Sequence, residues 1–185
     1  CTGMAAHSSL APLAVNAVHL ACDLVSAIRS RQQSIIETGT HDEAYNIPYT
    51  TLHVGRTEGG VQVNIVPQEA SVEFEIRNLA GDDPTILIEA ITQDIAPVIA
   101  AARKTSAEAD IRLTVVNSYP GLETALDERV VALLRDLTGV NATCKVAFGT
   151  EGGLFARDLG IPTVVCGPGS MDQGHKPDEF VTVEQ

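Results

Sequence analysis

The stretch "ASVEFEIRN", residues 70–78, decides which kind of fold this chain can adopt. Apolar side chains occupy the even-numbered positions from 70 to 76, and charged or hydroxyl side chains occupy the odd-numbered positions from 71 to 77. Successive side chains of a strand point to opposite faces, so this alternation is typical of a half-buried strand. The stretch therefore predicts a sheet that is covered on one face and open on the other.

The preceding residues predict a hairpin beside this strand. "TTLHVGRT", residues 50–57, and "VQVNIVP", residues 61–67, have the composition of strands, and "EGG" separates them. Two consecutive glycines supply the positive φ angles that a tight hairpin turn needs. A further strand is predicted over residues 110–118, "DIRLTVVNS". A truncated strand is predicted at the start of the chain.

Two helices flank these strands. The first is predicted over residues 14–33, with one apolar face made by Val15, Val18, Cys22, Val25 and Ile28. The second opens on Asp83 as N-cap and Pro84 at the first helical position. Its apolar stripe consists of Leu87, Ile91, Ile95 and Val98. Strand, helix, two strands, helix and strand is the βαββαβ order of a ferredoxin-like domain, which we predict over residues 1–118.

Residues 119–185 follow a different pattern. A helix is predicted over 127–138 with Gly139 ending it, and a short helix is predicted over 150–160. Buried strands are predicted over 143–149 and 161–167. Short apolar strands alternating with helices are α/β in character, so this part is predicted to be a partial α/β domain.

Composition excludes some classes of partner. The chain has 185 residues, of which 44% are hydrophobic, and a net charge of −12. Such an acidic chain is a poor ligand for nucleic acid or for anionic membranes, which attract basic surfaces. No apolar run in the sequence suggests a membrane span. The four cysteines form no C-x-x-C pair, and Cys22 and Cys166 are expected to be buried free thiols of a cytoplasmic protein.

Two histidines lie in unusual surroundings. His175 stands in the loop "CGPGSMDQGHKPDEF", residues 166–180, directly after a predicted buried strand. It can be a zinc ligand or a loop histidine bonded to a backbone carbonyl. His7 precedes two serines in "AAHSS". No G-x-S-x-G elbow is present to support a serine nucleophile, so His7 is either a functional residue or a surface histidine.

Three further sites have less specific signals. "GTEGG", residues 149–153, joins a predicted strand to a helix, and the backbone around Gly149 and Thr150 can hold a carboxylate. Arg77 can form a bidentate pair with a carboxylate or remain solvated on the open face of its strand. Asn64 lies in the second predicted hairpin strand.

Six motifs, in order and spacing, resemble the acetylornithine deacetylases. This group belongs to the dinuclear-zinc amidohydrolases, with succinyl-diaminopimelate desuccinylase and carboxypeptidase G. The motifs are "GMAAHSSLAPLAVNAV", "GGVQVNIVP", "FEIRN", "FGTEGGLF", "GIPTVVCGPGS" and "GHKPDEF". The resemblance implies a ferredoxin-like lid that forms a homodimer (residues 1–118), followed by the C-terminal part of a zinc-binding catalytic domain (residues 119–185).

The resemblance also implies residue roles. His175 matches the last zinc ligand, and His7 matches a lid histidine that reaches across the dimer to stabilise the oxyanion of the tetrahedral intermediate. Asn64 and Arg77 match lid residues that bind the substrate, and Gly149 and Thr150 match the turn that binds its other end. The expected cofactor is Zn²⁺, two ions per active site, with Co²⁺ as a possible substitute.

Most of the family's metal site has no counterpart in this sequence. The chain contains neither a His-x-Asp motif nor a Glu-Glu pair, so it supplies one zinc ligand and no general base. We therefore expect it to be inactive alone, although the complete enzyme would deacetylate N2-acetyl-L-ornithine in cytoplasmic arginine biosynthesis. The alternatives are a related hydrolase of N-acyl amino acids or peptides, resembling the desuccinylase or the carboxypeptidase, and a non-catalytic dimerisation module whose sheets pair edge to edge.

Overall fold

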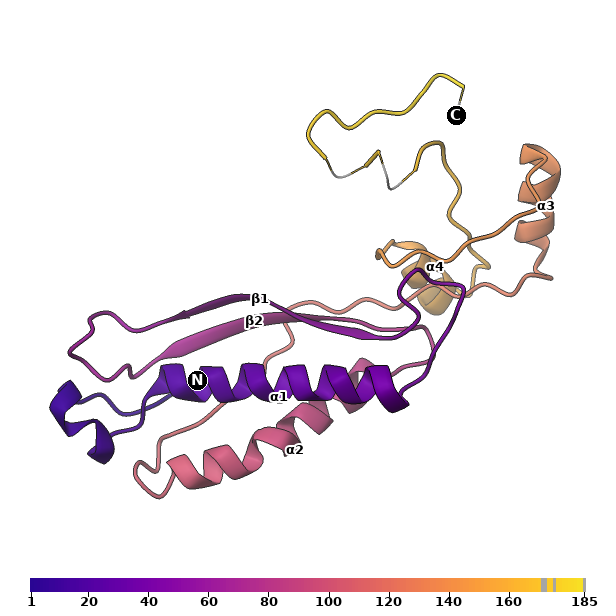
Figure 1. The fold of residues 1–185 in the computed structure, drawn as a ribbon. Helices are drawn as coiled ribbons and strands as arrows, with labels where there is room; N and C mark the ends of the chain where they lie inside the picture. The colour runs from indigo at the N-terminus through magenta and orange to yellow at the C-terminus, as the bar shows by residue number, and fades with distance from the viewer. Residues whose placement is uncertain (171–172, 175, 185) are drawn as a thin grey trace. The chain divides into compact units, whose positions relative to one another are not determined.

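A computed structural model describes residues 1–170, 173–174 and 176–184, and Figure 1 shows its ribbon. The chain divides into two compact units. Unit 1 comprises residues 1–118 together with 144–147, and unit 2 comprises residues 119–143 and 148–185 apart from the positions left out above. The architecture is mixed α and β, with one small antiparallel sheet among the described residues.

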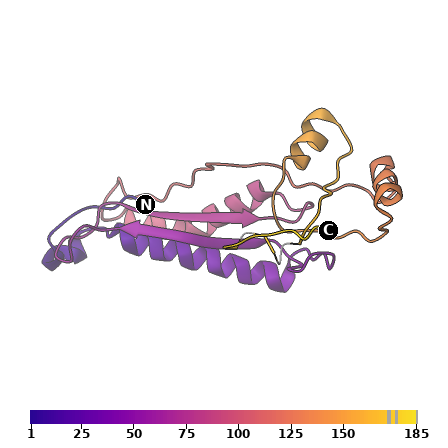
Figure 2. The ribbon, with the colours of Figure 1, turned by 90° about the horizontal axis from the view of Figure 1, so that it is seen from above.

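Unit 1 packs two long helices on one face of a two-stranded sheet. The helices are α1 (Ala17–Thr38) and α2 (Pro84–Ala102), and the strands are β1 (Thr51–Gly59) and β2 (Ala70–Arg77). Figures 1 and 2 show both helices on the same side of the antiparallel pair. The opposite face of the sheet presents charged side chains, as the alternation along residues 70–77 predicts.

Capping side chains determine the residue at which each of the two long helices begins. The side chain of Asn16 accepts hydrogen bonds from the backbone N–H groups of Val18 and His19, so α1 begins three residues later than predicted. Asp83 accepts from Thr85 N–H at 2.8 Å with Pro84 at the first helical position, as predicted.

The core lies between the helices and the covered face of the sheet. Ile91 and Ile95 of α2 are fully buried, and the whole predicted stripe of that helix contacts the core. The predicted face of α1 is wrong in part. Its buried residues are Ala17, Leu20, Ala21, Leu24, Ile28 and Ile35. The sequence offers two apolar stripes on this helix, and the one containing Leu20 and Leu24 packs into the core.

The predicted hairpin is also wrong. β1 pairs with β2 and not with residues 61–67, which form part of the connection between the two strands. Val61 and Val63 are 79% and 101% exposed, because no layer covers this connection. Isolated bridges instead join it to the start of the chain, where His7 pairs with Ile65.

The first and last predicted strands are reduced to single bridges. Thr2 bridges Glu69 on one side and Asp110 on the other. Since Glu69 directly precedes β2, the order of neighbouring segments is Asp110, then Thr2, then Glu69 with β2, and finally β1. Beyond Asp110 the predicted strand does not form, and Val116 is 95% exposed. The four-stranded ferredoxin-like sheet therefore stays a prediction.

A buried polar network fixes the start of β1. Thr50, the one buried polar residue among those described, donates its hydroxyl to Asp82 and accepts the N–H of Leu79 at 3.0 Å. Gln32 of α1 adds a second link, accepting from Leu52 N–H and donating to the Thr50 carbonyl at 3.3 Å. Each of these buried groups thus has a partner, which removes the cost of leaving it unsatisfied.

Unit 2 contains the two predicted helices without the predicted strands. The helices are α3 (Arg129–Thr138) and α4 (Gly152–Leu159), and each ends at a left-handed glycine, Gly139 with φ 68° and Gly160 with φ 64°. Residues 143–149 and 161–167 are irregular, and Val165 is 57% exposed. Buried parallel strands need neighbouring strands to pair with and helices over both faces of the sheet. The described residues of unit 2 contain α3 and α4 but no strand for these segments to pair with.

Two composition-based expectations are corrected. Cys22 and Cys166 are free thiols as expected, but both are exposed. In the described part of the chain, α2 is long and apolar enough to cross a membrane by length and composition alone. A core helix passes the same test, and Ile91 and Ile95 pack α2 against the core of unit 1.

Candidate functional site

His7 precedes the 3₁₀ helix η1 (Ser8–Leu13) and serves as its N-cap. Its Nδ1 accepts the backbone N–H of Ser9 at 3.2 Å and lies 2.8 Å from the Ser9 hydroxyl. A backbone N–H can only donate, so Nδ1 is the acceptor nitrogen and a neutral imidazole holds its proton on Nε2. The side chain is exposed. His7 can therefore present an Nε2–H donor to a group outside this chain.

The structure brings Asn64 close to His7. Ser8 donates its N–H to the Asn64 carbonyl at 3.0 Å, and Val66 donates to the Ala6 carbonyl at 2.8 Å. These bonds surround the His7–Ile65 bridge. The two predicted site residues thus lie on adjacent segments at the end of the sheet where β1 connects to β2 (Figure 1).

Arg77 lies at the opposite end of the same sheet. It pairs in register with Thr51, whereas Ala70 at the start of β2 pairs with Gly59. Arg77 lies seven residues after Ala70 along the strand, a length of about 24 Å. Arg77 Nη2 is 3.0 Å from the Glu75 carboxylate on the open face. The structure does not bring Arg77 together with His7 and Asn64.

The predicted turn at Gly149 and Thr150 belongs to unit 2. Thr150 Oγ1 accepts the N–H of Gly152 at 3.1 Å at the beginning of α4. Gly149 lies against the ring of Tyr119, where an added Cβ would overlap the ring atoms. Tyr119 was not predicted from the sequence, because no periodic pattern marks its ring as a wall of this turn.

Gly153 allows the close packing of this turn, which gives a testable prediction. A Cβ added there would overlap the carbonyl oxygen of Pro120 and lie 2.9 Å from that of Gly121. Gly153→Ala should therefore destabilise the turn by about 1–3 kcal/mol, since backbone must move. Faster amide hydrogen exchange in α4 would measure this. Gly167→Ala, with open space around the added Cβ, is the matched control, and equal exchange in the two variants would contradict the prediction.

The predicted metal ligand His175 lies outside the described residues. Among residues that are described, no group of three His, Cys, Asp or Glu side chains lies close enough to hold a metal ion. The described donor set therefore does not fit a zinc site. The pairs that shift a pKa include none of the predicted site residues. Lys145 donates to Asp42 at 2.7 Å and lowers the pKa of that carboxyl, as Arg157 does for Asp158.

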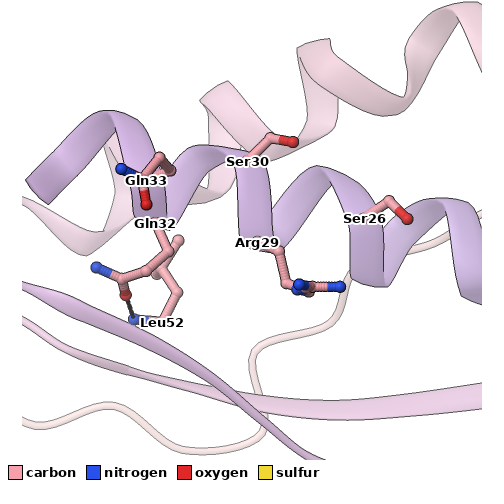
Figure 3. A pocket seen from close by; sticks show the side chains of 6 residues that line it. All are labelled: Ser26, Arg29, Ser30, Gln32, Gln33 and Leu52. Atoms are coloured by element: carbon pink, nitrogen blue, oxygen red, sulfur yellow. Dashed lines mark hydrogen bonds between the residues drawn. The ribbon is translucent and has the colours of Figure 1, made fainter. Parts of the chain in front are cut away.

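A groove of about 470 Å³ lies between α1 and the start of β1. Its lining residues are Ser26, Arg29, Ser30, Gln32, Gln33 and Leu52. Figure 3 shows five of them on α1, with the Gln32 amide bonded to Leu52 of β1. None of the predicted site residues lines this groove.

Solved structures of two other proteins have a fold similar to that of this chain. The solved structure of an M20 family metallo-carboxypeptidase from Sulfolobus solfataricus covers 99% of this chain with a TM-score of 0.62 at 19% identity, over 53% of its own length. A tripeptidase from Staphylococcus aureus subsp. aureus Mu50 covers 87% with a TM-score of 0.58 at 24% identity, over 39% of its own length. These likenesses show the fold alone.

Curated relatives extend the comparison over nearly the whole chain. An acetylornithine deacetylase of Salmonella heidelberg (strain SL476) is 34% identical over 182 residues, which is 97% of this chain and 45% of the relative. One from Pasteurella multocida (strain Pm70) is 31% identical over 99% of this chain and 46% of the relative. The chain thus spans about half the length of the curated relatives it matches.

The family model described as "Peptidase dimerisation domain" matches residues 1–103, which include the whole helix-and-sheet part of unit 1. M20 family proteins are metallopeptidases and related hydrolases, so the family implies a metal cofactor, commonly zinc. From the family match, the relatives and the fold together, we conclude that this chain belongs to the M20 peptidase family and contains its dimerisation domain.

Proposed function

We propose that this chain is the lid and C-terminal part of a zinc-dependent amidohydrolase that converts N2-acetyl-L-ornithine to ornithine and acetate in arginine biosynthesis. Relatives named acetylornithine deacetylase match 97% of the chain, which supports this substrate over others in the family. Residues 1–118 form the homodimeric lid, completed as a four-stranded ferredoxin-like sheet. Residues 119–185 belong to the catalytic domain. The enzyme acts in the cytoplasm.

The observation that carries the proposal is the hydrogen bond from Ser9 N–H to His7 Nδ1, which leaves Nε2 as the donor nitrogen of the imidazole. Hydrolysis of an amide develops negative charge on the carbonyl oxygen, and preorganised donors aimed at that oxygen lower the barrier. With Nδ1 accepting from Ser9 N–H, the imidazole is held in a fixed orientation with Nε2–H as its donor. Asn64, on the adjacent segment, supplies a side-chain amide on the same end of the lid.

The remaining site residues serve substrate recognition in this proposal. Arg77 forms a charge-assisted pair with a substrate carboxylate, and the Gly149–Thr150 turn binds the other end of the substrate. The described residues do not assemble a metal site. Zinc, which activates the attacking water in such enzymes, is held chiefly by residues outside this chain, with His175 as the ligand that the chain supplies.

Because Arg77 and His7 lie at opposite ends of one sheet, they cannot both reach the same small substrate. One lid therefore serves two active sites of a homodimer, with Arg77 in one and the His7–Asn64 pair in the other. The "Peptidase dimerisation domain" match is consistent with this arrangement.

Turnover of two substrates by two proteins tests the proposal. The complete protein that contains this chain, loaded with zinc, should hydrolyse N2-acetyl-L-ornithine faster than N-succinyl-L,L-diaminopimelate, and the chain alone should hydrolyse neither. Preference for the succinyl substrate or for a dipeptide would move the assignment to a related M20 hydrolase. Turnover by the isolated chain would contradict its expected inactivity.

A second candidate is a non-catalytic dimerisation module. The exposed edge of β1 favours it, because the described sheet consists of two strands and β2 is the neighbour of β1 within it. Absence of hydrolysis by the complete protein, together with a stable homodimer, would select this candidate.

A further inference from the structure

The open face of the sheet in unit 1 carries a row of polar and charged side chains. Phe74 and Ile76 of β2 pack on the core, and so do their register partners Val54 and Leu52 of β1. The residues between them point to the opposite face, because successive side chains of a strand alternate. This open face consists of Ser71, Glu73, Glu75 and Arg77 of β2, which lie opposite Glu58, Arg56, His53 and Thr51 of β1 in that order.

Ion pairs divide the charges of this face into two groups. Arg56 contacts both Glu58 and Glu73, the second at 2.9 Å. Arg77 Nη2 contacts the Glu75 carboxylate at 3.0 Å. Both side chains of this second pair are about half exposed, 45% for Arg77 and 49% for Glu75. The Arg77–Glu75 pair therefore offers one positive and one negative group to a ligand on the open face.

The charges of the proposed substrate complement this pair. Acylation removes the charge of the α-nitrogen in N2-acetyl-L-ornithine, which leaves one carboxylate and one side-chain ammonium. A zigzag of single bonds separates these two groups by about 6 Å in the extended molecule. Residues two apart on one face of a strand have Cα atoms about 7 Å apart. The substrate and the ion pair thus carry opposite charges at a similar spacing.

We propose that Glu75 gives the enzyme its specificity for a cationic side chain by binding the ammonium of the substrate while Arg77 binds the carboxylate. Both roles rest on the proposed function, to which Glu75 is added as a specificity-determining residue. A substrate that lies antiparallel to the ion pair places each of the four charges beside charges of opposite sign. Arginine has five N–H donors in a planar fork, so Arg77 can bind the substrate carboxylate and keep its contact with Glu75.

The same carboxylate disfavours a substrate that lacks the ammonium. A site closed over an apolar chain would remove water from Glu75 and leave it only Arg77, which is shared with the substrate carboxylate. Desolvating a charged group without supplying a new partner is costly. A site built to bond a polar group of its substrate therefore rejects the analogue without that group more strongly than an apolar pocket discriminates by size.

Two substrates that differ only in the ammonium test the role of Glu75. N2-acetyl-L-norvaline has a hydrogen atom where N2-acetyl-L-ornithine has the ammonium. In the complete protein loaded with zinc, Glu75→Gln should lower kcat/KM for the ornithine substrate by about 10–100-fold, the usual effect of one hydrogen bond to a charged group. It should leave kcat/KM for the norvaline substrate close to the wild-type value. Glu75→Asp, which retains the charge, should retain part of the preference for ornithine.

Glu73→Gln is the matched control. Glu73 is exposed on the same face of the same strand, but it bonds to Arg56. Its substitution changes the net charge of the open face as much as Glu75→Gln does. The ratio of the two kcat/KM values should nevertheless stay at the wild-type value in Glu73→Gln, because the proposed contact with the ammonium belongs to Glu75 alone.

The outcomes separate this role from the proposed function. Equal losses for both substrates in Glu75→Gln would overturn specificity and make Glu75 a positioning residue for Arg77. The same selective loss in Glu73→Gln would also overturn it, since the charge of the whole face would then be responsible. A wild-type enzyme that hydrolyses the ornithine substrate without preferring it to the norvaline substrate overturns the role of Glu75 and leaves the proposed function standing. Failure to hydrolyse N2-acetyl-L-ornithine at all overturns both.

Discussion

Replacing Ile91 by alanine is expected to destabilise unit 1 by about 2–5 kcal/mol, the range for large-to-small changes in a packed core. Ile91 is 0% exposed and lies in one cluster with Ile95 and Ile28, so truncation leaves a cavity between α2 and the rest of the core. The transfer free energy of the removed methyl and methylene groups adds to the loss of dispersion contacts along the cavity wall.

Ile86→Ala on the same helix is the matched control. Ile86 is 63% exposed, and its truncation should change stability by less than about 0.5 kcal/mol. Amide hydrogen exchange of α1 in the full chain measures both variants, because it reports on unit 1 even if unit 2 unfolds separately. Similar exchange rates in the two variants would mean that α2 does not pack on α1 as described.

Helices were predictable from the sequence because their signals are local. Asp83 and Pro84 start α2, and Gly139 and Gly160 end α3 and α4, each through contacts within a few residues. The buried face of α1 was not predictable in the same way. Two stripes of this helix are apolar, and the packing partners that decide between them come from distant parts of the chain.

Strand pairing was predicted less well because it depends on residues far apart in sequence. Residues 61–67 alternate as a strand does, yet β1 pairs with β2, and the connection is joined to the start of the chain by the bridges of Ile65 with His7 and of Glu69 with Thr2. The strand pattern of residues 143–149 and 161–167 likewise has no partner strand in the described chain. An apolar run indicates that a segment can be a strand, but only a neighbouring strand satisfies its backbone groups.

The candidate site shows the same division. Residue types at His7, Asn64 and Arg77 drew attention in the sequence, but their distribution between the two ends of one sheet required the structure. Tyr119 was missed because a single aromatic residue in a turn has no pattern. Gln32 was also missed, since a glutamine on a helix gives no sign that it bonds to the edge of a strand.

Mixed dimers of the complete enzyme should reveal which residues share an active site. Homodimers of His7→Ala should lose about 10²–10³-fold in kcat, the usual cost of one oxyanion donor. His7→Asp keeps an acceptor for the Ser9 N–H but has no N–H donor, so an equal loss would separate the donor role from the cap of η1. Arg77→Ala homodimers should also be impaired, with the loss chiefly in KM, because Arg77 is proposed to bind the substrate carboxylate.

Subunits of His7→Ala and Arg77→Ala that are mixed and allowed to exchange should regain about a quarter of the wild-type activity at a substrate concentration far below the KM of Arg77→Ala, because half of the dimers are mixed and one of their two sites is intact. In the proposed homodimer that site takes Arg77 from one subunit and His7 from the other, which would follow from their positions at opposite ends of the lid sheet. If both residues served the same site within one subunit's lid, every site of the mixed dimer would lack one of them, and mixing would restore nothing. Recovery is therefore expected only because Arg77 lies too far along β2 from His7 for both residues of one lid to reach one site, and the activity at that low substrate concentration, measured against the mixing ratio, tests this geometry.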